Sequence, residues 1–272
     1  MSGVSSHCHV SSQRCCHRGG VVGAFHSHSR APVSRPLARR RALVSRAASS
    51  RVPLCTIMSV PPRALVLLAD GSEEIETTAP VDILRRAGAH VKLASVEVVA
   101  GTWARLGVAA SRGVGLVGDV SVEEAAQGTW DVIVVPGGMP GAKHIRESEH
   151  AVKLLQSHKG HVAAICAAPA VVLADAGILA QGDKATCHPA FAESLTDQIG
   201  KCADDRVAVT ARTGGDQGSL VITSRGPGTA IEFSLALVAL IFGSEKAAEV
   251  AGPMVVHDGA LDGAAAVSAA LA

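Results

Sequence analysis

The stretch GHVAAICAAPAVVLADAG, residues 160–177, contains a single cysteine, Cys166, where an apolar, strand-like run changes into an alanine-rich, helix-like run. A strand that turns at once into a helix leaves its turn residue exposed at the sheet edge and often strained. The helix N-terminus directs unpaired N–H groups at the thiol, so we expect the pKa of Cys166 to be lowered. Because free cysteines are commonly buried, this local pattern favours reactivity and simple packing equally.

A carboxylate cluster follows the apolar run of residues 63–71 and could move protons beside a thiol. Its members are Glu73, Glu74 and Glu76. Acidic side chains are also stabilised at a helix start by the macrodipole, without any catalytic role. Taken alone, the cluster is therefore better explained as a helix start.

Backbone donors form the third candidate feature. Gly137 and Gly138 end the run WDVIVVPGG, and Ala167 follows the cysteine. Their N–H groups could stabilise an oxyanion, and glycine lets the backbone approach a ligand closely. His188 precedes Pro189 at a predicted loop-to-helix boundary, where a lone histidine is more often a surface or capping residue than a catalytic one.

The elements that must position these groups alternate along the chain between buried strands and amphipathic helices. This alternation predicts an α/β fold, with a mostly parallel sheet covered by helices on both faces. Ligands bind beyond the carboxyl ends of such strands, where the three features above should meet. The strands are expected at 63–71, 90–96, 130–138, 161–166, 205–214 and 219–228, with a hairpin at 103–117. The helices are expected at 73–89, 121–128, 148–160, 168–177, 188–200 and 229–242.

The pattern leaves two details of these elements open. Pro80 could kink the first helix or mark a restart, and the strands 205–214 and 219–228 could be antiparallel. Ser121 and Glu124 fit a capping box. The helix 229–242 is expected to close the domain, and the segment 254–272 to be a peripheral, low-complexity tail.

The first 60 residues differ in composition from the rest. Residues 1–62 contain nine Arg, many Ser, and no Asp, Glu or Lys, which is typical of a disordered organelle transit peptide. A disordered basic tail is the alternative, and a nucleic-acid arm is less favoured. We expect the destination of the protein to be the chloroplast, with the mitochondrion as second choice. If translation starts at Met58, the cytosol is expected instead.

The body domain is expected at residues 61–253, and the chain from Arg63 to its last residue is acidic. Of 25 Lys and Arg residues, nine precede Arg63, which leaves 16 against 24 acidic residues and a net charge of about −8. This charge argues against nucleic acid as a partner. No apolar run reaches the length of a membrane helix. Three body cysteines, Cys166, Cys187 and Cys202, fit a reducing compartment better than a disulfide scaffold.

Five motifs together resemble the DJ-1/PfpI superfamily, and within it the DJ-1 branch. They run in order from about Arg63 to Pro253: RALVLLADGSEEIETTAPVDILRRAG, DVIVVPGG, AAICAAP, TCHP and LVITSRGPGTAIEF. The resemblance implies a flavodoxin-like α/β sandwich with a strand-to-helix nucleophile elbow, and a homodimer. It implies neither a cofactor nor a metal.

The resemblance also assigns roles to residues. Cys166 matches the reactive elbow cysteine, Glu76 the glutamate thought to be protonated beside that sulfur, and His188 the nearby histidine. Gly137, Gly138 and Ala167 match the backbone donors of the pocket. Arg112 matches an arginine near the pocket or the dimer seam.

Two departures bear on function. Peptidase-like relatives place a histidine directly after the elbow cysteine, where this chain has Ala167, so proteolysis is not expected. Met139 and Cys187 stand where a polar residue and Thr are usual; Cys187 could resolve an oxidised Cys166, although a simple replacement of Thr is the more favoured interpretation.

The resemblance leaves two functions open. The first is a cofactor-free, glutathione-independent glyoxalase that acts on small reactive aldehydes, with a deglycase activity on glycated proteins as an extension. The second is a redox-sensing protective chaperone for misfolded proteins, whose elbow cysteine oxidises to a sulfinate.

Overall fold

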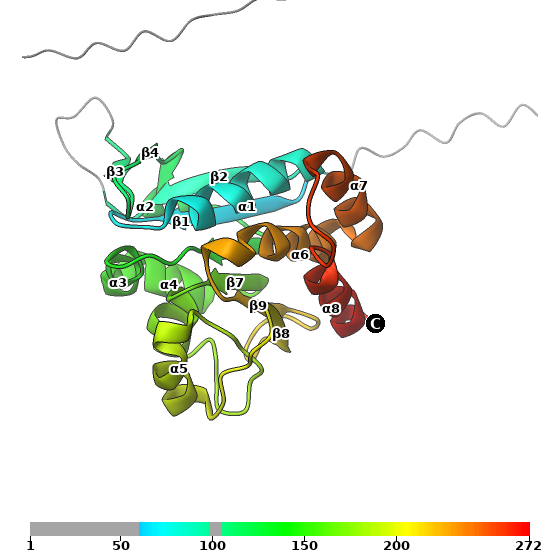
Figure 1. Ribbon diagram of the computed structural model, residues 1–272. Helices are drawn as coiled ribbons and strands as arrows, with labels where there is room; N and C mark the ends of the chain where they lie inside the picture. The colour runs from blue at the N-terminus through cyan, green and yellow to red at the C-terminus, as the bar shows by residue number, and fades with distance from the viewer. Residues whose placement is uncertain (1–59, 98–104) are drawn as a thin grey trace, which may run out of the picture. The chain divides into compact units, whose positions relative to one another are not determined.

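The computed structural model describes residues 60–97 and 105–272 (Figure 1). The predicted transit peptide, residues 1–60, lies outside this part of the chain except for its last residue. The first two residues of the predicted hairpin 103–117 lie outside it as well.

Helices and strands alternate along the described chain as the sequence predicts. The strands are β1 (Arg63–Leu68), β2 (His90–Ser95), β3 (Gly107–Ala109), β4 (Gly115–Val117), β5 (Val120–Ser121), β6 (Val132–Val135), β7 (His161–Ile165), β8 (Val207–Ala211) and β9 (Leu220–Ser224). The α-helices are α1 (Glu74–Ala87), α2 (Val122–Ala125), α3 (Gly141–Glu147), α4 (Glu149–Ser157), α5 (Ala192–Ile199), α6 (Ala230–Phe242), α7 (Ser244–Met254) and α8 (Asp262–Leu271). The shorter helical segments are the π-helix η1 (Pro169–Ala174) and the 3-10 turns η2 (Pro189–Phe191) and η3 (Pro227–Thr229).

Seven strands form one sheet in the order β5-β2-β1-β6-β7-β9-β8. Only β8 runs antiparallel to its neighbour, so the open question about the last two strands is answered in favour of an antiparallel pair. The strands β3 and β4 form a separate antiparallel hairpin within 105–117. This architecture confirms the predicted α/β fold.

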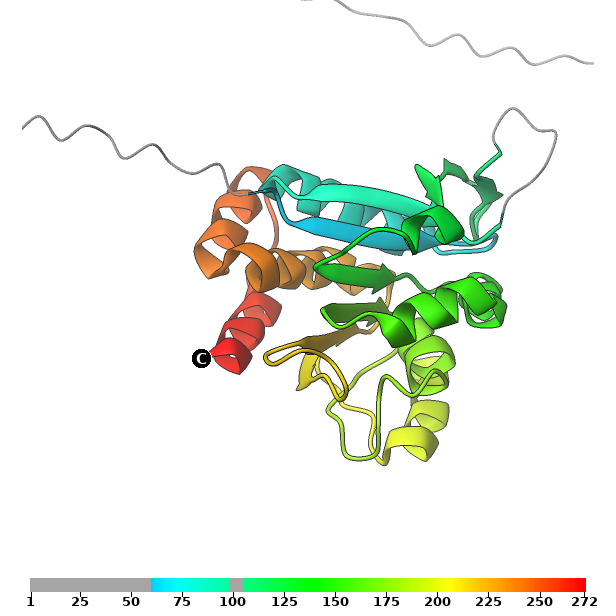
Figure 2. The ribbon, with the colours of Figure 1, turned by 180° about the vertical axis from the view of Figure 1, so that it is seen from behind.

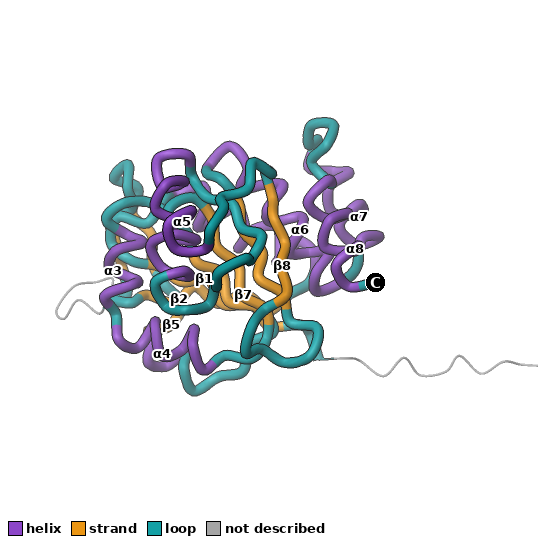
Figure 3. Tube along the Cα trace, turned by 90° about the horizontal axis from the view of Figure 1, so that it is seen from below, coloured by secondary structure: helices purple, strands orange, loops and turns teal. Residues whose placement is uncertain are grey.

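Helices cover both faces of the sheet because the side chains of each strand alternate between the faces. In β1, Ala64, Val66 and Leu68 pack with α1, α6, α7 and α8, whereas Leu65 and Leu67 pack with α3, α4, η1 and α5. Figure 3 shows the strands between α3, α4 and α5 on one side and α6, α7 and α8 on the other. The core therefore consists of two layers.

The predicted local signals mostly hold. The helix α1 runs through Pro80 without a restart, and Ser121 and Glu124 form the predicted capping box. The Gly88 C-cap adopts a left-handed conformation, with φ of 100°, which suits glycine.

The C-terminal segment corrects two expectations. The helices α7 and α8 follow α6, so the helix 229–242 does not close the domain. The red helix α8 lies against the orange α6 (Figure 2), and Val267 is fully buried in the core. Residues 254–272 are therefore not wholly a peripheral tail. The small residue Gly263 allows close packing, since a Cβ there would lie 2.9 Å from Val207.

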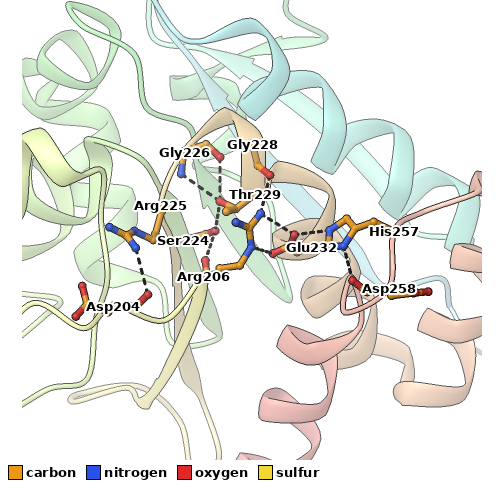
Figure 4. Close-up of polar contacts among 10 residues, drawn as sticks. All are labelled: Asp204, Arg206, Ser224, Arg225, Gly226, Gly228, Thr229, Glu232, His257 and Asp258. Carbon is orange, nitrogen blue, oxygen red and sulfur yellow. Dashed lines mark hydrogen bonds and ion pairs between the residues drawn. The ribbon is translucent and has the colours of Figure 1, made fainter.

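An ion-pair network around the buried Glu232 also ties this segment to α6. Glu232 accepts two hydrogen bonds from Arg206, at 2.7 and 2.8 Å, and lies 2.6 Å from Nε2 of His257 in the α7–α8 connection (Figure 4). Although burial by itself favours the neutral acid, the bonds from Arg206 and His257 lower the pKa of Glu232. The charged network therefore holds the last connection of the chain against α6.

None of the helices in 60–97 and 105–272 combines the length and the apolar character needed to cross a membrane.

Candidate active site

Cys166 occupies a strained elbow between β7 and η1. Its φ of 66° lies in the left-handed region that non-glycine residues rarely adopt. Its N–H donates to the carbonyl of Ser224 at 3.0 Å, and its own carbonyl accepts from the N–H of His188 at 2.8 Å. These bonds hold the elbow from two sides, as a strained functional residue requires. The predicted sharp turn is confirmed.

The three clustered glutamates have three different surroundings. Glu73 is the N-cap of α1 and accepts from the N–H of Glu76 at 2.7 Å. Glu74 accepts from the hydroxyl of Ser111 at 2.9 Å and from the N–H of Arg112, and so fixes the β3–β4 hairpin. Glu76 is fully buried and directed toward the elbow. The helix-start explanation therefore fits Glu73, whereas Glu76 belongs to the site.

Gly137 brings Glu76 and the cysteine together. A Cβ at this position would lie 2.6 Å from Cβ of Cys166 and 2.8 Å from Oε2 of Glu76, so no side chain fits. The N–H of Gly137 donates to Oε2 of Glu76 at 3.0 Å. This N–H is therefore engaged, and Gly137 is not the free oxyanion donor that we expected. The N–H groups of Gly138 and Ala167 act instead on the Cys166 sulfur, whose pKa they lower as hydrogen-bond donors.

Burial dominates the electrostatics of the site. It raises the pKa of Glu76 to about 7, which is the predicted direction. Burial, followed by the charge of Glu76, raises the pKa of Cys166 to about 12, although the N–H groups of Gly138 and Ala167 act to lower it. The prediction of a lowered cysteine pKa is therefore wrong. The helix after the elbow is a π-helix of only six residues, and its dipole does not outweigh desolvation.

The Cys166 thiol and the Glu76 carboxyl influence each other's ionisation. The thiol lowers the pKa of Glu76 as a hydrogen-bond partner, yet Oε1 of Glu76 has no partner at normal hydrogen-bond distance and angle within the described chain. A buried, unsatisfied carboxyl oxygen is costly. Oε1 is therefore positioned to exchange a proton with the sulfur or with a bound molecule.

A pocket of about 280 Å³ opens in front of the thiol. It is lined by Glu73, Ser111, Arg112, Gly138, Met139, Cys166, Ala167, His188, Ala190, Phe191 and Pro227. Of the residues predicted from the sequence, Glu76, Gly137 and Cys187 do not line it; Glu76 and Gly137 lie behind its wall.

His188 is the N-cap residue of η2. Its Nδ1 accepts from the N–H of Ala190 at 3.2 Å, so the neutral ring carries its proton on Nε2. Its ring also meets Phe191 edge to face, with ring centroids 6.4 Å apart. Phe191 is not among the residues predicted from the sequence, although its spacing from His188 across one helical turn could have indicated it.

Arg112 and Cys187 complete the predicted set. The Arg112 side chain lines the pocket and donates to the carbonyl of Ser111 at 3.1 Å. Cys187 is buried in the core layer opposite to that of Cys166, with its Sγ 3.8 Å from Sγ of Cys202. Cys187 therefore contacts Cys202, and the less favoured interpretation, in which Cys187 resolves an oxidised Cys166, stays a prediction.

The fold and the elbow define an α/β protein with a strained cysteine between a strand and a helix, and comparison with known proteins gives its family. A family model described as the DJ-1/PfpI family matches residues 62–240. The chain belongs to the DJ-1/PfpI family.

Individual relatives agree with this assignment. The chain is 44% identical to Protein DJ-1 homolog B of Arabidopsis thaliana over 74% of its own length but only 43% of that protein. It is 40% identical to the Parkinson disease protein 7 homolog of Danio rerio, over 72% of this chain and 98% of that one. The Glutathione-independent glyoxalase DJR-1.2 of Caenorhabditis elegans is 34% identical over 72% of this chain and 98% of that protein.

A solved structure has the same fold. The oxidized DJ-1 of Toxoplasma gondii superposes with a TM-score of 0.62 at 38% identity, covering 71% of this chain and 98% of that one.

Proposed function

We propose that the protein is a cofactor-free, glutathione-independent glyoxalase that converts methylglyoxal or glyoxal into a 2-hydroxy acid. One observation carries the proposal: Cys166 lines a small pocket and lies beside the buried Glu76, whose pKa is raised to about 7 and whose Oε1 is unsatisfied. The named activity of the Caenorhabditis elegans relative supports it.

The size of the pocket suits such a substrate. Its volume of about 280 Å³ lies below the roughly 300–1,000 Å³ that is usual for drug-sized ligands. A second hollow of about 740 Å³ shares Met139 and Ala190 with it. This adjoining space supports the extension to glycated side chains.

The reaction begins when the Cys166 sulfur attacks the aldehyde carbon and forms a C–S bond. Glu76, as a carboxylate, accepts the thiol proton through Oε1, and the N–H groups of Gly138 and Ala167 stabilise the oxyanion that forms. The product of this step is a hemithioacetal.

Two proton transfers then oxidise the carbon attached to sulfur and reduce the carbon next to it. A base removes the proton from the carbon attached to sulfur, which gives an enediol, and reprotonation of the adjacent carbon gives a 2-hydroxy thioester. Glu76 and His188 are the groups available for these transfers. Water cleaves the thioester, releases the hydroxy acid and restores the thiol, so the net reaction consumes one water.

The test is lactate formation from methylglyoxal without glutathione, comparing the full chain with Cys166→Ser and Glu76→Gln. We expect Cys166→Ser to be inactive and Glu76→Gln to lose about 10²-fold or more, the usual contribution of a general base. Normal turnover by purified, folded Cys166→Ser would refute the proposal.

A second function is favoured by the oxidized form in which the Toxoplasma gondii relative was solved. Oxidation of Cys166 to a sulfinate would place two oxygens among the N–H groups of Gly138 and Ala167, with protonated Glu76 as a donor. Intact-mass measurement after mild peroxide should show two added oxygens on wild type and none on Cys166→Ser. A Cys166 that stays reduced would remove this function.

We also propose that residues 1–60 are a transit peptide, with the chloroplast as destination, and that the body forms a homodimer. The acid-free composition and the family match, which begins at residue 62, support the first point. N-terminal sequencing of the natural protein tests it, and sedimentation of the body tests the second.

A further inference from the structure

A second pair of thiols lies away from the pocket. The sulfurs of Cys187 and Cys202 are 3.8 Å apart, and both cysteines are free. A disulfide needs an S–S distance of about 2.05 Å, so the sulfurs must approach by less than 2 Å.

The backbone around both cysteines is already joined. Ala185 pairs with Cys202 in a parallel bridge, and the N–H of Ala203 donates to the carbonyl of Ala185 at 2.8 Å. The hydroxyl of Thr186 donates to the carbonyl of Ala203 at 2.8 Å. These bonds hold the two segments side by side, so that side-chain rotation rather than backbone rearrangement brings the sulfurs together.

The two thiols differ in exposure, which sets the order of reaction. Cys202 is partly exposed, whereas Cys187 is only 1% exposed. Burial raises the pKa of Cys187. The neighbouring Cys202 raises it further, as does the charge of Cys166, while the charge of Arg225 lowers it. Arg225 is held nearby by its bond to the carbonyl of Asp204 (Figure 4). Cys202 is therefore the thiol that an oxidant meets first.

We propose that Cys187 and Cys202 form a second redox site, independent of Cys166, that closes to a disulfide when the protein meets a peroxide. The Cys202 sulfur breaks the peroxide O–O bond and becomes a sulfenic acid, releasing water from hydrogen peroxide. The Cys187 sulfur then attacks the sulfenic sulfur, and the S–O bond breaks. The thiol proton joins the departing hydroxide as a second water. The thiols lose two electrons, which reduce the peroxide.

The position of Cys187 links this site to the pocket. The next residue is His188, whose N–H donates to the Cys166 carbonyl. Cys187 also donates its thiol to the carbonyl of His188 at 3.4 Å, a contact that the disulfide removes. Formation of the Cys187–Cys202 disulfide therefore removes a contact of the pocket residue His188, while the Cys166 thiol takes no part in the reaction.

Tryptic mapping of the full chain tests the proposal, because cleavage after Lys184, Lys201 and Arg206 puts each cysteine in a separate peptide. Cys166, Cys187 and Cys202 fall in peptides 160–184, 185–201 and 202–206. The protein is treated with hydrogen peroxide, its remaining thiols are alkylated in denaturant, and it is digested without reductant.

We expect peptide 185–201 joined to 202–206, with the loss of two hydrogen atoms, and its disappearance after reduction. Cys166→Ser should give the same cross-link, which separates this result from the fate of the glyoxalase proposal. Cys202→Ser is the matched control and should leave peptide 185–201 alkylated.

Two results would overturn the proposal. One is peptide 185–201 joined to 160–184, which would make Cys166 the partner of Cys187. The other is full alkylation of Cys187 and Cys202 in wild type at a peroxide dose that oxidises Cys166. Both results are measured on the wild-type protein, so neither depends on how a variant folds.

Discussion

Cys166 and Glu76 lie on the two sides of Gly137, and each changes the ionisation of the other. Groups that interact this strongly titrate as a pair. With one shared proton, the pair can exist as a thiol beside a carboxylate or as a thiolate beside a carboxylic acid. The second form supplies the nucleophile for an aldehyde. A high cysteine pKa, of about 12, is therefore compatible with attack, provided that Glu76 takes the proton.

The buried Glu76 should make the folded protein less stable as the pH rises. Its pKa is 4.5 ordinarily and about 7 in the fold, so between these values the folded state holds a proton that the unfolded chain has released. Stability is then lost with rising pH, by about 3 kcal/mol in total. Glu76→Gln cannot ionise, so the free energy of unfolding of this variant should not show the loss.

Urea unfolding of both proteins between pH 4.5 and 8 measures the difference. Glu245→Gln, which changes an exposed glutamate of α7, is the control and should follow wild type. If the gap between wild type and Glu76→Gln stays constant with pH, Glu76 does not carry the raised pKa.

At the scale of elements, the turn after β6 fixes the distance between α1 and the elbow. Gly137→Ala would place a methyl group 2.6 Å from Cys166 Cβ. Overpacking of this kind costs about 1–3 kcal/mol, and we expect it to separate the thiol from Glu76 and reduce lactate formation strongly.

The control for that prediction is Gly252→Ala in α7, where a Cβ meets nothing within 4 Å. This change should be neutral or slightly stabilising in thermal unfolding, with activity unchanged. Full activity of Gly137→Ala would show that the close approach is not required.

Some features of the site could be predicted from the local sequence pattern, and others depend on contacts between distant segments. The strand-to-helix change predicted the Cys166 elbow, because both periodicities are local. Local pattern could not separate Glu76 from Glu73, since both suit a helix start; only the family resemblance did so. The direction of the Cys166 pKa depended on how deeply the tertiary fold buries the sulfur. The pairing of Cys187 with Cys202 likewise required two segments that meet only in three dimensions.

At the scale of the whole molecule, the C-terminal helix belongs to the packed body. An alanine-rich sequence looks peripheral because it lacks large apolar residues, but small residues allow α8 to approach α6 and β8 closely. Val267→Asp should therefore destabilise the protein by at least about 2 kcal/mol, since it places a charge where a valine is fully buried.

The matched control is Leu271→Asp in the same helix, where the side chain is 47% exposed. Its midpoint in urea should stay close to that of wild type. Equal midpoints for Val267→Asp and wild type would mean that α8 contributes little to the fold.

In the proposed mechanism, Cys166 and Glu76 act as one unit that must hold a single proton. The pH dependence of kcat/KM for methylglyoxal, measured without glutathione, reports whether the two groups share that proton. Wild type should rise to a plateau with an apparent pKa of about 7, because Glu76 must be ionised to accept the thiol proton. Glu76→Gln should be slower by about 10²-fold or more and should lack this rise. A Glu76→Gln protein with the rate and the pH profile of wild type would contradict the account.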